Sequence, residues 1–329
     1  MLHCRQGDGV RAARFLGDGR ISIIDAAAPV LGPDEVIVDV AACALCGSDF
    51  RPLQQGWPLT PGHEIFGHVR APGTADHGRR VLVYIPTFCG QCVQCVAGRT
   101  HLCPHAELLG WQRPGGYAQS LAVPRRCLLA VPDDIPDRLA PLLLDVIGTT
   151  AHGIRQAARV VQPGAALVIG AGPIGLGSLL VLQALQWGPI FVCEPNPQRA
   201  AFAASLSATV LTAKQAEALQ VPLVIEASGK DAGRALALTA VAQEGAAVQL
   251  GESDQWSISE TRAIRRKDYF LIRSFYFPLS DYAANIKILR ANLSQFEKLV
   301  DATADLDGLE TLFAAFARGE RIKPLLCPT

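Results

Sequence analysis

The strongest constraint on the fold is a glycine-rich turn, G-x-G-x-x-G, which follows an apolar run at residues 167–169 and opens a second apolar run. The first run has the length of a buried strand, and the second has the length of a helix. Gly170 permits the turn, Gly172 lets a pyrophosphate approach the backbone, and Gly175 lets the helix pack closely on the strand. The helix N-terminus provides an anion site. The residues predicted to bind a dinucleotide are Gly170, Gly172, Pro173, Ile174 and Gly175.

An acidic residue ends the next predicted strand, which spans residues 190–194. Glu194 lies about 20 residues beyond the glycine turn, where a carboxylate accepts hydrogen bonds from the hydroxyls of an adenosine ribose. Because the same charge repels a 2′-phosphate, the pattern favours NAD over NADP. Arg199, on the helix predicted to follow, either contacts such a phosphate or belongs to a solvated helix face.

The order of the predicted elements divides the chain into two regions. From about residue 21 to residue 131, short β-rich segments such as 36–40 and 80–84 are separated by glycine and proline turns, which predicts an irregular β region. Beyond residue 165, strands alternate with helices, which predicts a parallel sheet and an α/β fold class. The strands expected there span residues 167–169, 190–194, 223–227, 247–250 and 270–275. The expected helices span residues 174–186, 197–205, 231–242, 281–291 and 309–317.

Composition narrows the classes of function. A chain of 329 residues has the length of two domains. Lys and Arg number 30 and so do Asp and Glu, so no net field attracts nucleic acid or an anionic membrane, and a small, roughly neutral partner is expected. No apolar run approaches the roughly 20 residues of a membrane span, and residues 1–9 are polar, so we expect a cytoplasmic protein.

Four of the ten cysteines stand in the pattern C-x2-C-x2-C-x7-C at Cys89, Cys92, Cys95 and Cys103. Four thiolates from one loop close a tetrahedral shell around zinc without an open position, so a structural zinc site is predicted in a lobe at residues 86–105. Free thiols, a redox pair and an iron–sulfur cluster are the alternatives that spacing alone leaves open.

Three other segments carry potential metal ligands: C-G-S-D at residues 46–49, G-H-E at 62–64 and D-V-I-G-T at 145–149. Taken singly, they are a thiol, a loop histidine and a solvated acid. Together with the cysteine lobe, the glycine turn and the G-G-Y-A segment at residues 115–118, and in this order, they resemble the zinc-dependent medium-chain dehydrogenase/reductase family. The resemblance covers essentially the whole chain and is greatest to alcohol, polyol and threonine dehydrogenases.

The resemblance implies a Rossmann NAD-binding domain at residues 147–277 and an irregular, GroES-like catalytic domain at residues 1–146 and 278–329. It implies two zinc ions per chain, NAD as the cofactor, a small alcohol or carbonyl substrate, and a homodimer or homotetramer. The oligomer would form through an edge strand such as residues 270–277. The site residues that it implies are Cys46, His63 and Asp145 as catalytic zinc ligands, Glu64 beside the metal, Asp49 orienting His63, Ser48 in a proton relay, and Thr149 beside the nicotinamide.

Two residues depart from the family pattern. Asp145 stands where the family usually has a cysteine or a glutamate and is shorter than the glutamate, so it binds the metal either directly or through water. Arg51 stands where many relatives have the histidine that ends the proton relay, and an arginine cannot accept a proton near neutral pH. We therefore expect the proton to pass from Ser48 to a ribose hydroxyl and then to water, while Arg51 binds an anionic group or is simply solvated.

The sequence leaves the substrate open. Phe50, Trp57 and Trp111 lie near the ligand motifs and would line an apolar cleft or pack inside the β region. The favoured function is oxidation of a secondary alcohol or polyol with NAD. The alternatives are an NADPH-dependent zinc reductase of a biosynthetic pathway and a cofactor-binding protein that lacks catalytic zinc because of Asp145.

Overall fold

The computed structural model of the chain describes residues 9–253, 255–258 and 261–328. It has two compact units: Met1–Leu144 with Val300–Thr329, and Asp145–Leu299. The second unit extends beyond the expected border at residue 277, because helices α9 (Tyr282–Ala291) and α10 (Leu293–Glu297) contact helix α4 (Pro173–Ala184). One such contact is a hydrogen bond of 3.2 Å that the Asn292 side chain donates to the Leu180 carbonyl.

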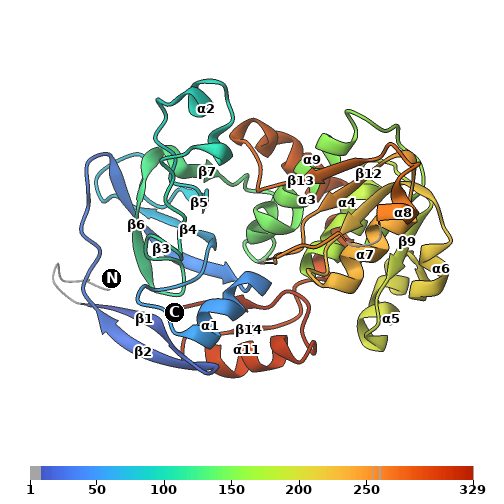
Figure 1. Cartoon of the computed structure of the whole chain (residues 1–329). Coiled ribbons are helices and arrows are strands. Elements are labelled where there is room, and N and C mark those ends of the chain that lie inside the picture. The colour runs from blue at the N-terminus through green and yellow to red at the C-terminus, as the bar shows by residue number, and fades with distance from the viewer. Residues whose placement is uncertain (1–8, 254, 259–260, 329) are drawn as a thin grey trace. The chain divides into compact units, whose positions relative to one another are not determined.

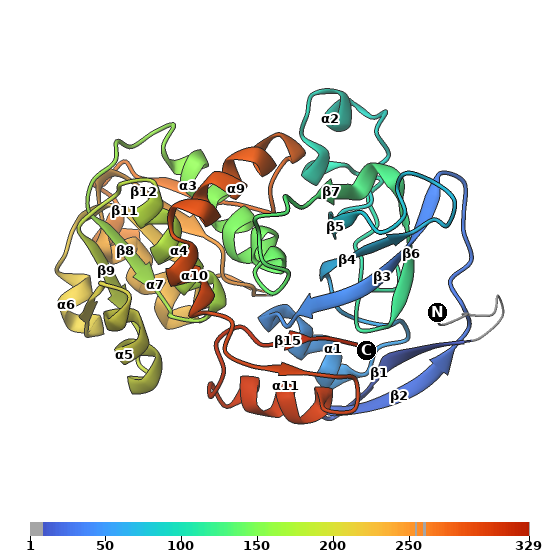
Figure 2. The same cartoon turned by 180° about the vertical axis from the view of Figure 1, so that it is seen from behind.

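The first unit is built on a largely antiparallel sheet in the order β14-β15-β3-β4-β5-β7, with β6 paired to β3 and a separate hairpin of β1 and β2 (Figures 1 and 2). Its strands are β1 (Val10–Gly17), β2 (Arg20–Ala26), β3 (Glu35–Ala44), β4 (Glu64–Arg70), β5 (Arg80–Val83), β6 (Ser120–Pro124), β7 (Leu128–Ala130), β14 (Thr303–Ala304) and β15 (Leu325–Leu326). Its helices are α1 (Phe50–Gln55), α2 (Val93–Val96) and α11 (Leu309–Ala317).

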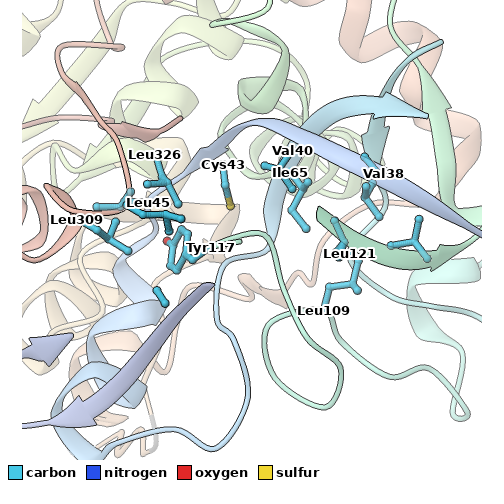
Figure 3. Close-up of a cluster of buried hydrophobic side chains, with 14 of the residues drawn as sticks. Val38, Val40, Cys43, Leu45, Ile65, Leu109, Tyr117, Leu121, Leu309 and Leu326 are labelled. Atoms are coloured by element: carbon cyan, nitrogen blue, oxygen red, sulfur yellow. The ribbon is translucent and has the colours of Figure 1, made fainter. Parts of the chain in front are cut away.

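The core of this unit follows from alternation along β3. Val36, Val38 and Val40 are buried and the residues between them are only half-buried, which is the period of two expected of a strand with one face on the core. Figure 3 shows part of this core, in which Leu309 and Leu326 from the C-terminal segment lie with residues of the N-terminal segment such as Leu45 and Tyr117. Residues 300–329 therefore complete the core of the first unit.

The second unit has a six-stranded parallel sheet in the order β10-β9-β8-β11-β12-β13. The strands are β8 (Ala166–Ile169), β9 (Ile190–Cys193), β10 (Thr209–Leu211), β11 (Val221–Glu226), β12 (Val241–Gln249) and β13 (Phe270–Arg273). The helices are α3 (Thr150–Ala157), α4, α5 (Pro197–Ser205), α6 (Ala213–Glu217), α7 (Asp231–Ala240), α8 (Thr261–Ile264), α9 and α10. The unit begins with a π-helical turn, Asp145–Thr149.

Helices cover both faces of this sheet, as a parallel sheet requires. On one face, Leu167 and Ile169 of β8 share an apolar cluster with Ala237 of α7. On the other, Val168 lies where a side chain on Gly175 of α4 would meet it. All four residues of β8 are buried.

The expected fold class is confirmed: a parallel α/β unit and an antiparallel β-rich unit. Helices α5 and α11 have the predicted bounds. The sequence did not predict strand β1, which precedes the region from residue 21 to residue 131 in which β strands are expected. It did not predict the π-helical turn either, because a π-helix has no distinct hydrophobic period. Within the part of the chain that the structure describes, no helix has both the length and the hydrophobicity needed to span a bilayer.

Candidate functional site

Strand pairing brings two of the ligand motifs together in the first unit. The end of β3 pairs with the start of β4, so that Ala44 lies opposite Glu64. Cys46 follows Ala44 by two residues and His63 precedes Glu64 by one. The thiol of Cys46, a ring nitrogen of His63 and a carboxylate oxygen of Glu64 consequently lie within 4.8 Å of one another.

The backbone before His63 requires glycine. Gly62 has a φ of +93°, a conformation that side chains disfavour. A Cβ at this position would also lie 2.7 Å from the ring of Tyr117. The glycine of the G-H-E motif thus lets the chain turn tightly against Tyr117 and deliver His63 to the cluster.

Asp49 organises the cluster through three contacts. Its Oδ2 accepts hydrogen bonds from the backbone N–H of Cys46 at 3.0 Å and from the hydroxyl of Tyr117 at 2.6 Å. Its Oδ1 lies 3.4 Å from Nδ1 of His63. Because Nδ1 faces the carboxylate, Nε2 is the ring nitrogen directed to a metal, the arrangement by which carboxylates orient ligand histidines. Burial, followed by the negative charge of Asp49, raises the pKa of Tyr117 well above its usual value, so its hydroxyl stays a donor.

Glu64 is fully buried and forms an ion pair with Lys323, which is also fully buried. Sequence reasoning missed both Lys323 and the hydroxyl of Tyr117. Lys323 lies far from the other ligand motifs in the sequence, and its only signal is a lysine within an apolar C-terminal segment. Tyr117 belongs to the G-G-Y-A segment, but that pattern gave no role to the hydroxyl.

The donor set fits a transition-metal ion such as zinc. A thiolate, an imidazole and a carboxylate are the ligand types that zinc prefers, and an acid in contact with the imidazole completes the expected outer shell. Asp145 opens the second unit, directly after Leu144. Within that unit, its Oδ1 accepts a hydrogen bond of 3.1 Å from the Thr149 hydroxyl.

The four cysteines of the lobe also converge. Three sulfur–sulfur separations are 3.9 Å for Cys89 and Cys95, 3.8 Å for Cys92 and Cys103, and 3.6 Å for Cys103 and Cys89. Four sulfurs at about 2.3 Å from one zinc are about 3.8 Å apart in a tetrahedron, whereas a disulfide needs about 2.05 Å. The distances fit one tetrahedral ion, since an iron–sulfur cluster spreads its thiolates over several irons.

One of these thiols is already disposed to ionise. The backbone N–H of Gln91 is the largest of the influences that lower the pKa of Cys89 to about 6, and burial opposes it. Burial instead raises the pKa of Cys95 to about 12, with its sulfur neighbours contributing in the same direction. A metal ion would compensate the charge of both thiolates.

The residues predicted to line a cleft divide into two groups. Phe50 stacks on Phe316, with ring centroids 5.2 Å apart, and packs against the core. The rings of Trp57 and Trp111 meet edge to face at 5.6 Å, and Trp111 lies 6.4 Å from the His63 ring.

The guanidinium carbon of Arg51, on α1, lies 5.4 Å from the centre of the Trp111 ring. Ser48 is half-buried in the 3-10 turn Gly47–Asp49.

The glycine turn of the second unit joins β8 to α4. Gly170 has a φ of +92° and abuts Ser228, so that a Cβ would lie 3.0 Å from the Ser228 backbone. A Cβ on Gly175 would lie 1.8 Å from the Gly170 carbonyl oxygen, whereas a Cβ on Gly172 would meet nothing within 4 Å. Pro173 is the first residue of α4, and the carbonyl of Ile174 accepts a hydrogen bond of 2.8 Å from Ser178. The open side at Gly172, beside a helix N-terminus, fits a pyrophosphate.

Glu194 stands beside this turn. Its Oε2 accepts a hydrogen bond of 2.6 Å from the backbone N–H of Ala171, and its Oε1 accepts one of 2.8 Å from that of Asn196. Asn196 caps α5, accepting from the backbone N–H groups of Gln198 and Arg199. The Nε of Arg199 is buried and has no hydrogen-bond partner among the described residues.

The known proteins to which this chain is similar in sequence are dehydrogenases. Residues 32–133 match the family described as alcohol dehydrogenase GroES-like domain. An L-threonine 3-dehydrogenase of Chelativorans sp. (strain BNC1) is 35% identical over 190 residues, which are 54% of this chain and 54% of that protein. Another L-threonine 3-dehydrogenase, from Mesorhizobium japonicum, is 32% identical over 219 residues, which are 62% of this chain and 63% of that protein. The chain thus spans somewhat more than half the length of these relatives.

Solved structures share the fold over nearly the whole chain. An alcohol dehydrogenase from Thermus sp. ATN1 superposes with a TM-score of 0.87 at 26% identity, covering 97% of this chain and 100% of that one. Galactitol-1-phosphate dehydrogenase from Escherichia coli gives a TM-score of 0.86 at 23% identity, with coverages of 97% and 100%. A short chain alcohol dehydrogenase from Escherichia coli CFT073, complexed with NADH, gives a TM-score of 0.87 at 23% identity, with coverages of 98% and 100%.

Proposed function

Because the chain belongs to the zinc-containing medium-chain alcohol dehydrogenase family, we propose that it transfers a hydride between a secondary alcohol or polyol and NAD. The observation that carries this proposal is the cluster of Cys46, His63 and Glu64, in which Asp49 already orients the histidine. A site without a ligand would have no need of a buried acid in contact with a buried histidine.

In this proposal, Cys46, His63 and Asp145 hold a catalytic zinc ion, with Glu64 beside it. When bound, the zinc supplies Lewis-acid stabilisation to an alcohol or carbonyl oxygen, and the nicotinamide supplies the hydride acceptor or donor. Ser48 would relay the proton that leaves the alcohol, its hydroxyl accepting that proton as it gives up its own toward solvent, and a bound cofactor would supply a ribose hydroxyl on this path. Arg51 cannot take that proton. Thr149 would lie beside the nicotinamide of a bound cofactor and, by its hydrogen bond to Asp145, restrains that carboxylate.

The glycine turn and Glu194 are the proposed cofactor site. Gly170, Gly172, Pro173, Ile174 and Gly175 form the pyrophosphate cradle, and the backbone bonds to Ala171 and Asn196 keep the Glu194 carboxylate next to it. A carboxylate at that place favours the free ribose hydroxyls of NAD over the phosphate of NADP. One observation favours the alternative, an NADPH-dependent reductase: the unpartnered Nε of Arg199 is a donor suited to a phosphate.

Zinc content is the first test of this function. Elemental analysis of protein purified without added metal should give about two zinc ions per chain, falling to about one in a Cys46→Ala variant. About one ion in both proteins would instead support a cofactor-binding protein without catalytic zinc. Alcohols, with L-threonine among them because of the names of the relatives, are then assayed with NAD and with NADP. Reduction of NADP alone would favour the reductase.

We also propose that the protein acts as a homodimer or homotetramer. Strand β13 is an edge of the parallel sheet, and Phe270 and Leu271 on it are 44% and 40% exposed. An unpaired apolar edge strand readily pairs with a second copy. Sedimentation of the wild type and of a Leu271→Lys variant tests this, since pairing through β13 predicts that the variant sediments as a monomer.

A further inference from the structure

The proposed metal ligand Asp145 belongs to an unusual piece of backbone. The turn Asp145–Thr149 at the start of the second unit is π-helical, and the regular helix α3 continues directly from it. In an α-helix a carbonyl accepts from the N–H group four residues ahead, whereas in a π-helix it accepts from the one five residues ahead. Where one pattern passes into the other, a carbonyl loses its regular partner and needs another donor. Single π-helical turns are rare and are found mostly at functional sites.

A threonine side chain supplies such a donor. The hydroxyl of Thr150, the first residue of α3, lies 2.6 Å from the carbonyl oxygen of Val146 and 3.2 Å from that of Ile147, and all three residues are fully buried. The hydroxyl donates to these carbonyls, which belong to the π-helical turn. Because a buried carbonyl without a donor costs about as much free energy as a lost hydrogen bond, Thr150 stabilises the turn relative to a regular helix.

A glycine on the neighbouring helix makes room for the turn. Helix α4 contacts the π-helical turn, and a Cβ on Gly177 of α4 would lie 2.5 Å from the carbonyl oxygen of Val146. It would also lie 2.8 Å from Cγ1 of Val146. Since glycine is a poorer helix former than alanine, the close approach of the turn explains its presence in the middle of α4.

The turn sets the orientation of the Asp145 carboxylate. Thr149 donates a hydrogen bond of 3.1 Å to Oδ1 of Asp145, which fixes the carboxylate relative to the turn. Thr150 and Gly177 fix the turn relative to α3 and α4. A change in the number of residues per turn rotates the side chains at its start about the helix axis. A turn that reverted to a regular helix would therefore direct Asp145 elsewhere.

We propose that Thr150 is a positioning residue for the catalytic metal, because its hydroxyl holds the π-helical turn that orients the Asp145 carboxylate. The proposal rests on the proposed function, since it takes Asp145 as a ligand of the zinc ion at Cys46 and His63. Without the hydroxyl, the turn relaxes toward a regular helix. The carboxylate then leaves its position, and the metal is held less tightly.

The first experiment measures zinc affinity in Thr150→Val, which removes the hydroxyl and keeps the branched shape of the side chain. Competition with a chelator gives the affinity, and the zinc retained by the Cys46→Ala counterpart of each protein is subtracted because it belongs to the cysteine lobe. We expect the affinity of the remaining site to fall about tenfold, as for other residues that orient metal ligands. Thr150→Ser keeps the hydroxyl and should bind zinc as the wild type does.

Ser178→Ala is the matched control. Ser178 is also fully buried in the second unit and donates a hydrogen bond of 2.8 Å to the carbonyl four residues earlier, but it does so within the regular helix α4. Both changes should lower the melting temperature of the metal-free protein, whereas only Thr150→Val should lower the zinc affinity. Hydrogen exchange of the metal-free proteins should show faster exchange at residues 145–150 in Thr150→Val alone.

Two further variants test the route by which Thr150 acts. In an Asp145→Asn background, Thr150→Val should lower the zinc affinity no further, because the carboxylate that it orients is already absent. Additive losses of affinity would contradict the proposal. Gly177→Ala displaces the same turn without removing a hydrogen bond, so it should also lower the zinc affinity, and an unchanged affinity would count against the proposal.

The outcomes separate this proposal from the proposed function. If Asp145→Asn lowers the zinc affinity and Thr150→Val leaves it unchanged, the positioning role is wrong and the proposed function stands. If Asp145→Asn has no effect, Asp145 is not a ligand and the positioning role fails with it. If the wild type binds zinc only in the lobe, both proposals fail. If Thr150→Val does not fold, Gly177→Ala takes its place with the same expectations.

Discussion

The substitution Tyr117→Phe removes one hydrogen bond from the metal cluster and almost nothing else. The ring stays packed against Gly62 and against Phe313, whose centroid is 5.7 Å away. Only the hydroxyl that donates to Asp49 at 2.6 Å is lost. Hydrogen bonds to charged groups contribute about 1.5–3 kcal/mol, and Asp49 keeps the Cys46 N–H and its contact with His63. We therefore expect the free energy of unfolding of the metal-free protein to fall by about 1.5–3 kcal/mol.

Tyr117→Phe should also weaken the positioning of His63 and so lower the affinity for a metal ion. Outer-shell partners of metal ligands change metal affinity by roughly 10- to 100-fold, and Tyr117 acts through Asp49, so the lower end, about tenfold, is expected. Denaturant titration of the metal-free protein and chelator competition of the zinc-loaded protein measure the two effects.

Tyr84→Phe is the matched control for this experiment. Tyr84 is also buried in the first unit, but its hydroxyl lies 3.2 Å from the neutral Thr100 hydroxyl. A hydrogen bond between two neutral groups contributes about 0.5–1.5 kcal/mol. Tyr84→Phe should therefore lower the free energy of unfolding by less than Tyr117→Phe does, and zinc binding at Cys46 and His63 should be unchanged. If Tyr117→Phe unfolds at the wild-type denaturant concentration and releases zinc at the wild-type rate, Asp49 does not depend on Tyr117 and the reasoning is refuted.

Three further predictions follow from single residues. Ser48→Ala should lower kcat far more than Arg51→Ala, which should instead raise KM for anionic alcohols relative to neutral ones; equal effects on kcat would contradict the proposed proton route. Gly172→Ala should leave the melting temperature unchanged but weaken NAD binding, whereas Gly175→Ala should destabilise the second unit because its Cβ would lie 1.8 Å from the Gly170 carbonyl oxygen. Burial tends to raise the pKa of Asp281, but the hydrogen bond from His152 and the charge of Arg155 outweigh it and lower that pKa below 3.8. The stabilisation from Asp281 is therefore present above pH 3.8 and is lost as the pH falls through the lowered value, so the destabilisation caused by Asp281→Asn at pH 7 should vanish in acid, as measured by denaturant titration at both pH values.

The parts of the site that sequence could predict are those that depend on local backbone. Gly62 and His63 are adjacent, and the turn that presents the histidine is encoded in the motif itself. The glycine turn at residues 170–175 is likewise a local strand–turn–helix, so the roles of its glycines could be read from spacing alone.

The parts that could not be predicted depend on contacts between distant segments. Lys323 lies 259 residues from Glu64, and the Tyr117 hydroxyl meets Asp49 only because the segment of Gly115 and Gly116 crosses beneath Gly62. The hydrophobic periodicity of a sequence gives no information about such contacts between distant segments. The C-terminal border of the second unit could not be predicted for the same reason, because α9 and α10 contact α4, which lies far earlier in the sequence.

The path of the chain through its two units also determines which unit is completed first during synthesis. Residues 145–299 are contiguous, so the second unit is complete when the ribosome reaches Leu299. The first unit then still lacks α11, β15 and Lys323, although Cys46, His63 and Glu64 were made long before. Until the last segment docks, the apolar side chains that cover Leu309 and Phe313 in the finished core are uncovered, and Glu64 lacks its ion pair with Lys323. The four cysteines of the lobe are thus made early, whereas the cluster of Cys46, His63 and Glu64 acquires its final arrangement only after the last strand has joined the sheet.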